Sequence, residues 1–140
     1  MILLDTNVLS AIMRQNPDRA VISWLDGQPR NSVWTTSITV LEVRLGLQIM
    51  PAGKKRSALI SMFERLLTEV TEGRILSFDT AAAQQAANLM ALRQRAGRPV
   101  ELRDTMIAGI ALASRATLAT RNAKHFADLA LPVINPWDMQ

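Results

Sequence analysis

Short apolar runs alternate along the chain with longer stretches whose apolar residues recur every three or four positions. Runs of three or four apolar or β-branched residues are too short for buried helices, but they suit strands of a parallel sheet that is covered on both faces. The predicted strands are residues 2–4, 33–36, 75–78, 117–120 and 132–134. In the segments between these strands, the apolar residues recur at helical spacing. This alternation is typical of an α/β fold with a central, mainly parallel sheet of about five strands flanked by helices.

The predicted helices begin after residues that favour caps and end near Pro or Gly. They cover residues 8–13, 19–26, 37–50, 54–72 and 79–96, and a last one begins near residue 104. Ser37 or Thr39 is expected to cap the third helix. One apolar face of that helix repeats at spacings of three and four and should contact the core; it consists of Ile38, Leu41, Leu45 and Ile49. Gly109 and the neighbouring alanines would let the last helix pack closely against the sheet.

Three carboxylates occupy positions next to this predicted core. Asp5 directly follows the first strand, Glu42 lies on the apolar face of the third helix, and Asp104 heads the buried face of the last one. In open α/β sheets, ligands bind in the crevice beyond the carboxyl ends of the strands, where Asp5 and Asp104 should both lie. A plainer role is also open to Asp5, because an acid there can cap the following helix. Glu42 needs a basic partner, a polar cavity or a cation, since desolvating an unpaired carboxylate is costly.

Acidic side chains that converge without a balancing Lys or Arg repel one another unless a cation lies between them. Oxygen ligands suit Mg²⁺ or Mn²⁺, which bind through one or two carboxylates together with waters and substrate phosphates. A metal ion held there would activate water and neutralise charge on a phosphodiester. The positions of the three acids therefore favour metal-dependent phosphodiester chemistry.

Composition narrows the class of protein. A chain of 140 residues is expected to form one domain, residues 1–140. Its apolar runs are far shorter than the ~20 residues that span a bilayer, and the first one meets Asp5 too early for a signal peptide. The absence of cysteine excludes disulfides and Cys-ligated zinc and fits a cytoplasmic protein. The net charge of +4 would help nucleic acid approach, although basic residues that only keep the fold soluble would give the same balance.

Four motifs, in order along the chain, carry a resemblance that covers essentially all of it. They are residues 1–9 (MILLDTNVL), 38–46 (ITVLEVRLG), 103–108 (RDTMIA) and 118–122 (LATRN), followed by Asn135-Pro136-Trp137. Together they resemble the PIN-domain toxins of the VapC type, most closely the FitB-like branch. The resemblance implies a single PIN domain with Mg²⁺- or Mn²⁺-dependent ribonuclease activity. Members of this family are usually toxins of type II toxin–antitoxin pairs, silenced by an antitoxin encoded beside them.

Carried over by position, Asp5, Glu42 and Asp104 match the three acidic site positions of the family. The fourth family position is commonly Asp or Asn, and here it is Asn122. An Asn side chain can hydrogen-bond a phosphate or a water, but it adds no charge and cannot act as a base. Many relatives carry a further acid three residues later, where this chain has His125, so one metal ion or two remains open. We expect His125 to be a surface or packing residue.

Two threonines resemble hydroxyls that support the site in relatives. They are Thr6, directly after the first acid, and Thr120, at the end of the fourth strand. Each has a plainer role as well, because a threonine at that position can cap the helix that follows.

These features lead to the hypothesis of an endoribonuclease toxin. Asp5 and Asp104 would coordinate the metal, and Glu42 would bind it or orient the water that attacks an RNA phosphodiester in line. Candidate contacts to the RNA backbone are Lys54, Lys55, Arg56, Arg93, Arg95 and Arg121. The resemblance also implies a homodimer and a small DNA-binding antitoxin that covers the acidic site within a higher assembly. It implies no membrane partner.

Two other classes of protein stay open. With Asn122 in place of an acid, the fold could bind RNA or an antitoxin–DNA complex as a weak or inactive nuclease. A phosphoacceptor or phosphatase domain also places Asp at strand ends, but Asp5 has no second Asp two residues on. The RNA target and the antitoxin class are not determined by these patterns.

Overall fold

Five parallel strands form one sheet in the order β3-β2-β1-β4-β5. The structure is a computed structural model that describes residues 1–139. The strands are β1 (Ile2–Leu4), β2 (Val33–Thr36), β3 (Ile75–Leu76), β4 (Thr117–Ala119) and β5 (Val133–Ile134). The first segment of the chain is thus the central strand, and β5 is an edge strand. The parallel α/β fold with about five strands is confirmed.

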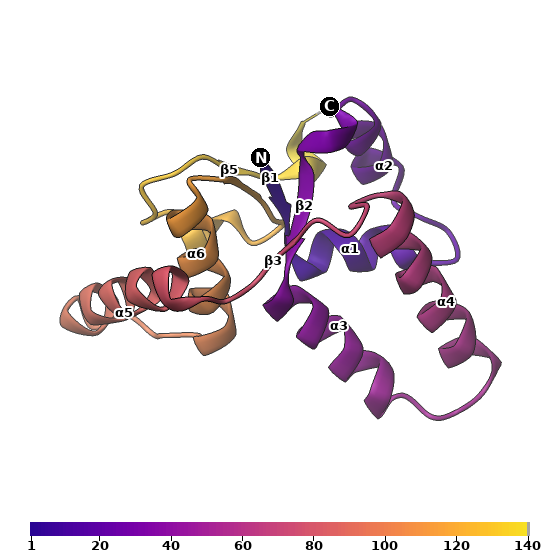
Figure 1. Cartoon of the computed structure of the whole chain (residues 1–140), viewed down its shortest axis with the longest axis horizontal. Coiled ribbons are helices and arrows are strands. Elements are labelled where there is room, and N and C mark those ends of the chain that lie inside the picture. The colour runs from indigo at the N-terminus through magenta and orange to yellow at the C-terminus, as the bar shows by residue number, and fades with distance from the viewer. Residues whose placement is uncertain (140) are drawn as a thin grey trace.

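Helices cover both faces of this sheet (Figure 1). One face carries α1 (Thr6–Met13), α2 (Arg19–Asp26), α3 (Ser37–Ile49) and α4 (Lys54–Glu69), and the other carries α5 (Thr80–Arg95) and α6 (Leu102–Ser114). Short 3-10 helices lie at Arg30–Ser32, Ala123–Phe126 and Pro136–Asp138. No helix in residues 1–139 combines the length and the apolar character that crossing a membrane requires.

Alternation along β1 sends consecutive side chains into two separate cores. Leu4 joins the core under the α1–α4 layer, while Leu3 joins the core under α5 and α6. Both leucines are fully buried, and each burial contributes about 1.5–3 kcal/mol. A strand covered on both faces has no polar side, which explains why Ile2–Leu4 is continuously apolar.

Of the four apolar α3 residues predicted to contact the core, Ile38 is buried and the other three are not. Leu41, Leu45 and Ile49 are 50%, 46% and 76% exposed. The buried face consists of Ile38, Thr39, Val43 and Leu47. Both faces repeat at intervals of about four residues, so periodicity alone cannot choose between them. The rotation of α3 is set where the helix leaves β2.

The cap of α3 also differs from the prediction. The hydroxyl of Thr36, the last residue of β2, accepts a hydrogen bond from the backbone N–H of Thr39 at 3.0 Å. The predicted caps, Ser37 and Thr39, both lie inside the helix. Because a strand residue is the cap, helix α3 starts directly at the carboxyl edge of the sheet.

Close packing of α6 is confirmed. Its apolar residues share a buried core with strands β1 and β4, while Gly109 faces helix α5. A Cβ atom built on Gly109 would lie 2.5 Å from the carbonyl oxygen of Ala82 and 2.9 Å from the Cβ of Ala86, both in α5. The Ala-rich face of α5 thus supplies the small residues that this approach needs. Helices α5 and α6 thus pack as one layer, and Asp104 lies in the first turn of α6.

Candidate active site

Three neighbouring strands end in polar residues at the carboxyl edge of the sheet. Thr36 ends β2, Asp5 follows β1, and Thr120 follows β4. Because β1 is central and parallel to both neighbours, these residues lie side by side, and all three are buried. This edge therefore holds a cluster of buried polar groups, as the crevice rule for α/β sheets predicts.

Asp5 is the centre of a hydrogen-bond network. Its Oδ1 accepts from the backbone N–H of Thr6 at 2.8 Å, so the carboxylate caps α1. Its Oδ2 accepts from the Thr120 hydroxyl, also at 2.8 Å, and Nδ2 of Asn7 lies 3.5 Å away. Asp5 thus caps α1 and also lies within the polar cluster at the carboxyl edge. The prediction that Thr120 supports the site agrees with this contact, whereas its alternative role as a helix cap is not seen.

The electrostatic environment of Asp5 disfavours its negative charge. Burial raises the pKa of this carboxyl from 3.8 to about 6, against the lowering effect of the hydrogen bonds from Thr120 and Thr6. The charges of Asp104 and Glu42 raise the pKa further. No Lys, Arg or His in the described part of the chain forms an ion pair with Asp5. The structure thus brings Asp104 and Glu42, the other two predicted acids, within electrostatic reach of Asp5.

Glu42 enters this site from α3 and is held on both of its oxygens. The Thr6 hydroxyl donates to Oε1 at 2.7 Å, so Thr6 orients Glu42 and does not cap α1. Nε of Arg103, at the start of α6, lies 3.6 Å from Oε2. A basic partner and a polar site therefore both account for Glu42 in its partly buried position. Sequence spacing missed Arg103 because the two residues meet only across the fold, although Arg103 lies within a recognised motif.

Asp104 projects from the first turn of α6 and is partly buried. Nδ1 of His125 lies 3.6 Å from its Oδ2. The side chain of His125 is 62% exposed, as expected for a surface residue, yet it borders the site. A pocket of about 500 Å³ opens beside these two residues and is also lined by Arg93, Arg98, Pro99, Val100, Glu101 and Lys124. The open side of the acidic site is therefore bordered by basic groups.

Asn122 lies at the rim of the site, in the exposed turn after β4. Its backbone N–H donates to the Thr120 hydroxyl at 3.1 Å. The N–H of Arg121 donates to Oδ1 of Asn7 at 3.0 Å, and the guanidinium of Arg121 lies 4.7 Å from the ring centroid of Trp137. Asn7 thus links the α1 and β4 ends of the site.

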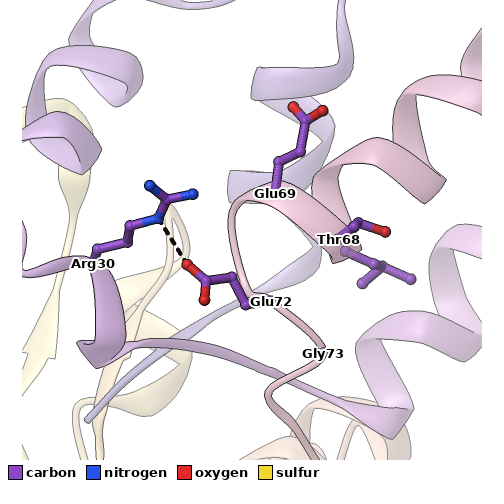
Figure 2. A pocket seen from close by; sticks show the side chains of 6 residues that line it. Arg30, Thr68, Glu69, Glu72 and Gly73 are labelled. Carbon is purple, nitrogen blue, oxygen red and sulfur yellow. Dashed lines mark hydrogen bonds and ion pairs between the residues drawn. The ribbon is translucent and has the colours of Figure 1, made fainter.

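A broader hollow of about 830 Å³ lies at the opposite edge of the sheet. Figure 2 shows Arg30 and Glu72 of this hollow, whose Nε and Oε1 are 2.7 Å apart. Both residues precede strands, β2 and β3 respectively, so the hollow lies at the amino ends of the strands. Besides this exposed ion pair, Thr68 and Glu69 line the hollow, and both of its acidic side chains, Glu69 and Glu72, are exposed. The carboxyl edge is therefore the better candidate for an active site.

The donor set at the carboxyl edge suits a hard divalent cation. Within residues 1–139, no three His, Asp or Glu side chains are grouped closely enough to enclose a metal ion. Mg²⁺ and Mn²⁺ do not need such a cage, because they take one or two carboxylates and keep several waters. The buried, unpaired Asp5 beside Asp104 meets this smaller requirement, while both oxygens of Glu42 have partners within the chain.

The fold and this acidic edge define the class of protein. A family model described as PIN domain matches residues 2–131, and the chain belongs to the PIN domain family. It is 40% identical over 138 residues to VapC ribonuclease Y4jK of Sinorhizobium fredii, with 99% of each chain covered. It is 36% identical over 137 residues to Toxin FitB of Neisseria gonorrhoeae, covering 98% of this chain and 99% of that relative.

A solved structure extends this likeness to three dimensions. The structure of FitAB bound to an IR36 DNA fragment matches with a TM-score of 0.89 at 36% identity, covering 100% of this chain and 98% of that one. The resemblance to VapC-type and FitB-like PIN-domain toxins, predicted from the four motifs, is confirmed.

Proposed function

We propose that the protein is a metal-dependent endoribonuclease that acts as the toxin of a toxin–antitoxin pair. The observation that carries this proposal is the buried Asp5 carboxylate, whose pKa is raised to about 6 in the presence of two further acids and without a basic partner. A bound cation would reduce the repulsion between the carboxylates of such a site. The likeness to a VapC ribonuclease and to Toxin FitB supports RNA as the substrate.

In this proposal Asp5 and Asp104 hold Mg²⁺ or Mn²⁺ through carboxylate oxygens. When bound, the metal ion lowers the pKa of a water and offsets the charge of the phosphodiester. The hydrogen bonds from Thr6 N–H and the Thr120 hydroxyl keep the Asp5 oxygens in a fixed direction. This pre-ordering reduces the entropy lost when substrate binds.

Glu42 is the group best suited to orient the attacking water or to accept its proton. The Thr6 hydroxyl holds its Oε1 at 2.7 Å, and Arg103 lies 3.6 Å from its Oε2. The Arg103 contact is long and half-exposed, so it contributes little stability and can open when RNA enters. Asn122 at the rim donates a hydrogen bond from its amide to a phosphate oxygen.

The RNA strand approaches past the basic border of the pocket. Lys124 and His125 line this approach beside Asp104. Arg121, held over the ring of Trp137, presents a further cation next to Asn122. These groups attract the phosphate backbone without reading a base sequence, so cleavage should weaken as the salt concentration rises.

The partner inferred for this chain is a DNA-binding antitoxin. The likeness to FitAB bound to DNA supports this partner, and carboxylates at the open site would accept an Arg side chain from it. The homodimer, the cytoplasmic location and the extent of the PIN domain over residues 1–140 remain predictions.

RNA cleavage by refolded protein, freed of any copurified partner, tests the nuclease. It is measured with Mg²⁺, with Mn²⁺ and with EDTA for wild type, Asp104→Asn and the matched control Asp26→Asn, which changes an exposed acid in α2. Loss of an outer-shell partner typically lowers activity about 10–100-fold, so loss of a ligand should lower it at least about 100-fold. A folded Asp104→Asn variant that cleaves at the wild-type rate would refute the assignment.

A catalytically weak module that binds RNA or an antitoxin–DNA complex is the alternative, favoured by the uncharged Asn122. Calorimetric titration with Mn²⁺ separates the two functions. Binding that is lost in Asp5→Asn supports the nuclease. No binding by wild type, together with no cleavage of a broad RNA pool, supports the module.

A further inference from the structure

Arg93 and Asp5 are the two charged residues that are almost completely buried in the described chain, each 4% exposed. Arg93 is one of the candidate contacts to the RNA backbone, but its side chain is buried and therefore not free to meet a phosphate. Burying a guanidinium is costly unless its N–H groups find acceptors within the protein. The partners of Arg93 therefore indicate what its burial achieves.

Every nitrogen of the Arg93 guanidinium has a partner. Nε donates to Oδ2 of Asp128 at 2.9 Å and Nη2 donates to Oδ1 at 3.0 Å, which makes a bidentate pair. Nη2 also donates to the carbonyl oxygen of His125 at 2.9 Å, and Nη1 donates to the Thr105 hydroxyl at 3.1 Å. The hydrogen bonds from Arg93 hold the pKa of Asp128 below its usual value. This planar pattern of donors is one that Lys cannot reproduce.

These contacts join three segments that meet at the candidate active site. Arg93 lies in the last turn of α5, Thr105 directly follows Asp104 in α6, and His125 and Asp128 lie in the segment that begins at Asn122. Within residues 1–139, the Asp104 side chain itself meets this segment only through the 3.6 Å approach of His125. Arg98, in the turn between α5 and α6, also donates to Oδ2 of Asp128 at 3.0 Å, but its side chain is half-exposed. The Arg93 guanidinium is thus the buried polar link between the segments that present Asp104 and Asn122.

We propose that Arg93 is a positioning residue for the candidate active site. Its guanidinium holds the segment from Asn122 to Asp128 against the first turn of α6, and so sets the distance from Asp104 to the rim at Asn122 and His125. The effect on catalysis rests on the proposed nuclease function. The effect on the position of the segment does not depend on that function.

His125 makes the position measurable, because it is the only histidine in the chain. Its ring C–H signals in NMR spectra of the full-length, metal-free protein at fixed pH report this one place beside Asp104. The variant Arg93→Lys keeps the charge but loses the bidentate fork. The matched control Arg65→Lys changes an arginine on α4 that makes a single exposed pair with Glu69.

At a temperature where all proteins are fully folded, we expect the His125 signals of Arg93→Lys to move toward those of free histidine. The kcat of Arg93→Lys for RNA cleavage should fall about 10–100-fold, which is the usual effect of losing a group that orients a ligand. Its KM should stay within about threefold of wild type. Arg65→Lys should match wild type in both measurements. A role confined to stability would lower the unfolding midpoint and leave the signals and kcat of the folded protein unchanged.

A second variant covers the case in which Arg93→Lys does not fold. Thr105→Val keeps the side-chain shape, removes only the link to α6, and should shift the His125 signals in the same direction by a smaller amount. Wild-type His125 signals in a folded variant would overturn the proposal, with or without a loss of kcat. If wild type cleaves no RNA, the proposed function fails, while the NMR shifts still decide the role of Arg93.

Discussion

Replacing Asp5 with Asn should stabilise the metal-free protein while it removes metal-dependent cleavage. The pKa of Asp5 is raised from 3.8 to about 6 in the folded protein, mainly by burial. The folded state therefore binds this proton more tightly than the unfolded chain does. The contribution of Asp5 to the free energy of unfolding is therefore greatest below pH 3.8 and is lost as the pH rises through about 6. A shift of roughly two pKa units corresponds to about 3 kcal/mol of lost stability at pH 8.

An Asn at this position cannot ionise, so the variant avoids that loss. It still accepts a hydrogen bond from the N–H of Thr6, but its amide cannot accept the hydroxyl proton of Thr120 as Oδ2 does at 2.8 Å. Losing that bond costs about 1 kcal/mol. The net expectation is a gain of about 2 kcal/mol in the free energy of unfolding at pH 8.

Urea unfolding in EDTA, followed by circular dichroism, measures this gain at pH 8 and again near pH 4.5. The gain should shrink at the lower pH, because wild-type Asp5 then takes up its proton. With Mn²⁺ in place of EDTA, wild type should be stabilised more than Asp5→Asn, since only an intact site gains binding energy. Asp26→Asn is the control and should shift neither midpoint. An Asp5→Asn variant that is no more stable than wild type in EDTA at pH 8 would refute this account of the site.

Three further substitutions test the packing and the C-terminal motif. Gly109→Ala should destabilise the protein by about 1–3 kcal/mol, because the new Cβ would lie 2.5 Å from the carbonyl oxygen of Ala82. Gly46→Ala has no neighbour within 4 Å and should stabilise α3 by about 0.5–1 kcal/mol. Equal urea midpoints for the two variants would contradict this reasoning. Trp137→Phe removes the indole N–H that donates to Asp18 at 2.9 Å and lowers its pKa. In the variant, the pKa of Asp18 measured by carbon-detected NMR should rise toward its ordinary value. The variant should be less stable than wild type at neutral pH, and this difference should fade as the pH drops through the range in which Asp18 takes up its proton. An unchanged pKa would show that the hydrogen bond is not formed in solution.

Much of the fold could be predicted because it depends on neighbours in the sequence. Short apolar runs in the sequence predict the strands, and parallel strand order predicts that Asp5 and Asp104 lie beyond their carboxyl ends. The pairing of β1 with β4, which brings Thr120 beside Asp5, is seen only in the structure. The sequence predicted the three acids as a group, and their joint effect on the pKa of Asp5 places them within electrostatic reach of one another.

The sequence by itself determined the strand and helix order, the parallel class of the sheet and the acids that its strand ends and helices present, because these follow from local spacing and capping. Only the tertiary structure decided that α3 turns Leu41 to solvent, that Arg103 meets Glu42, and that Arg93 is buried against Asp128. Each of these joins or separates residues far apart along the chain. Periodicity records that a face is apolar or that a residue is charged, but not what lies opposite it. That information exists only once the helices have packed.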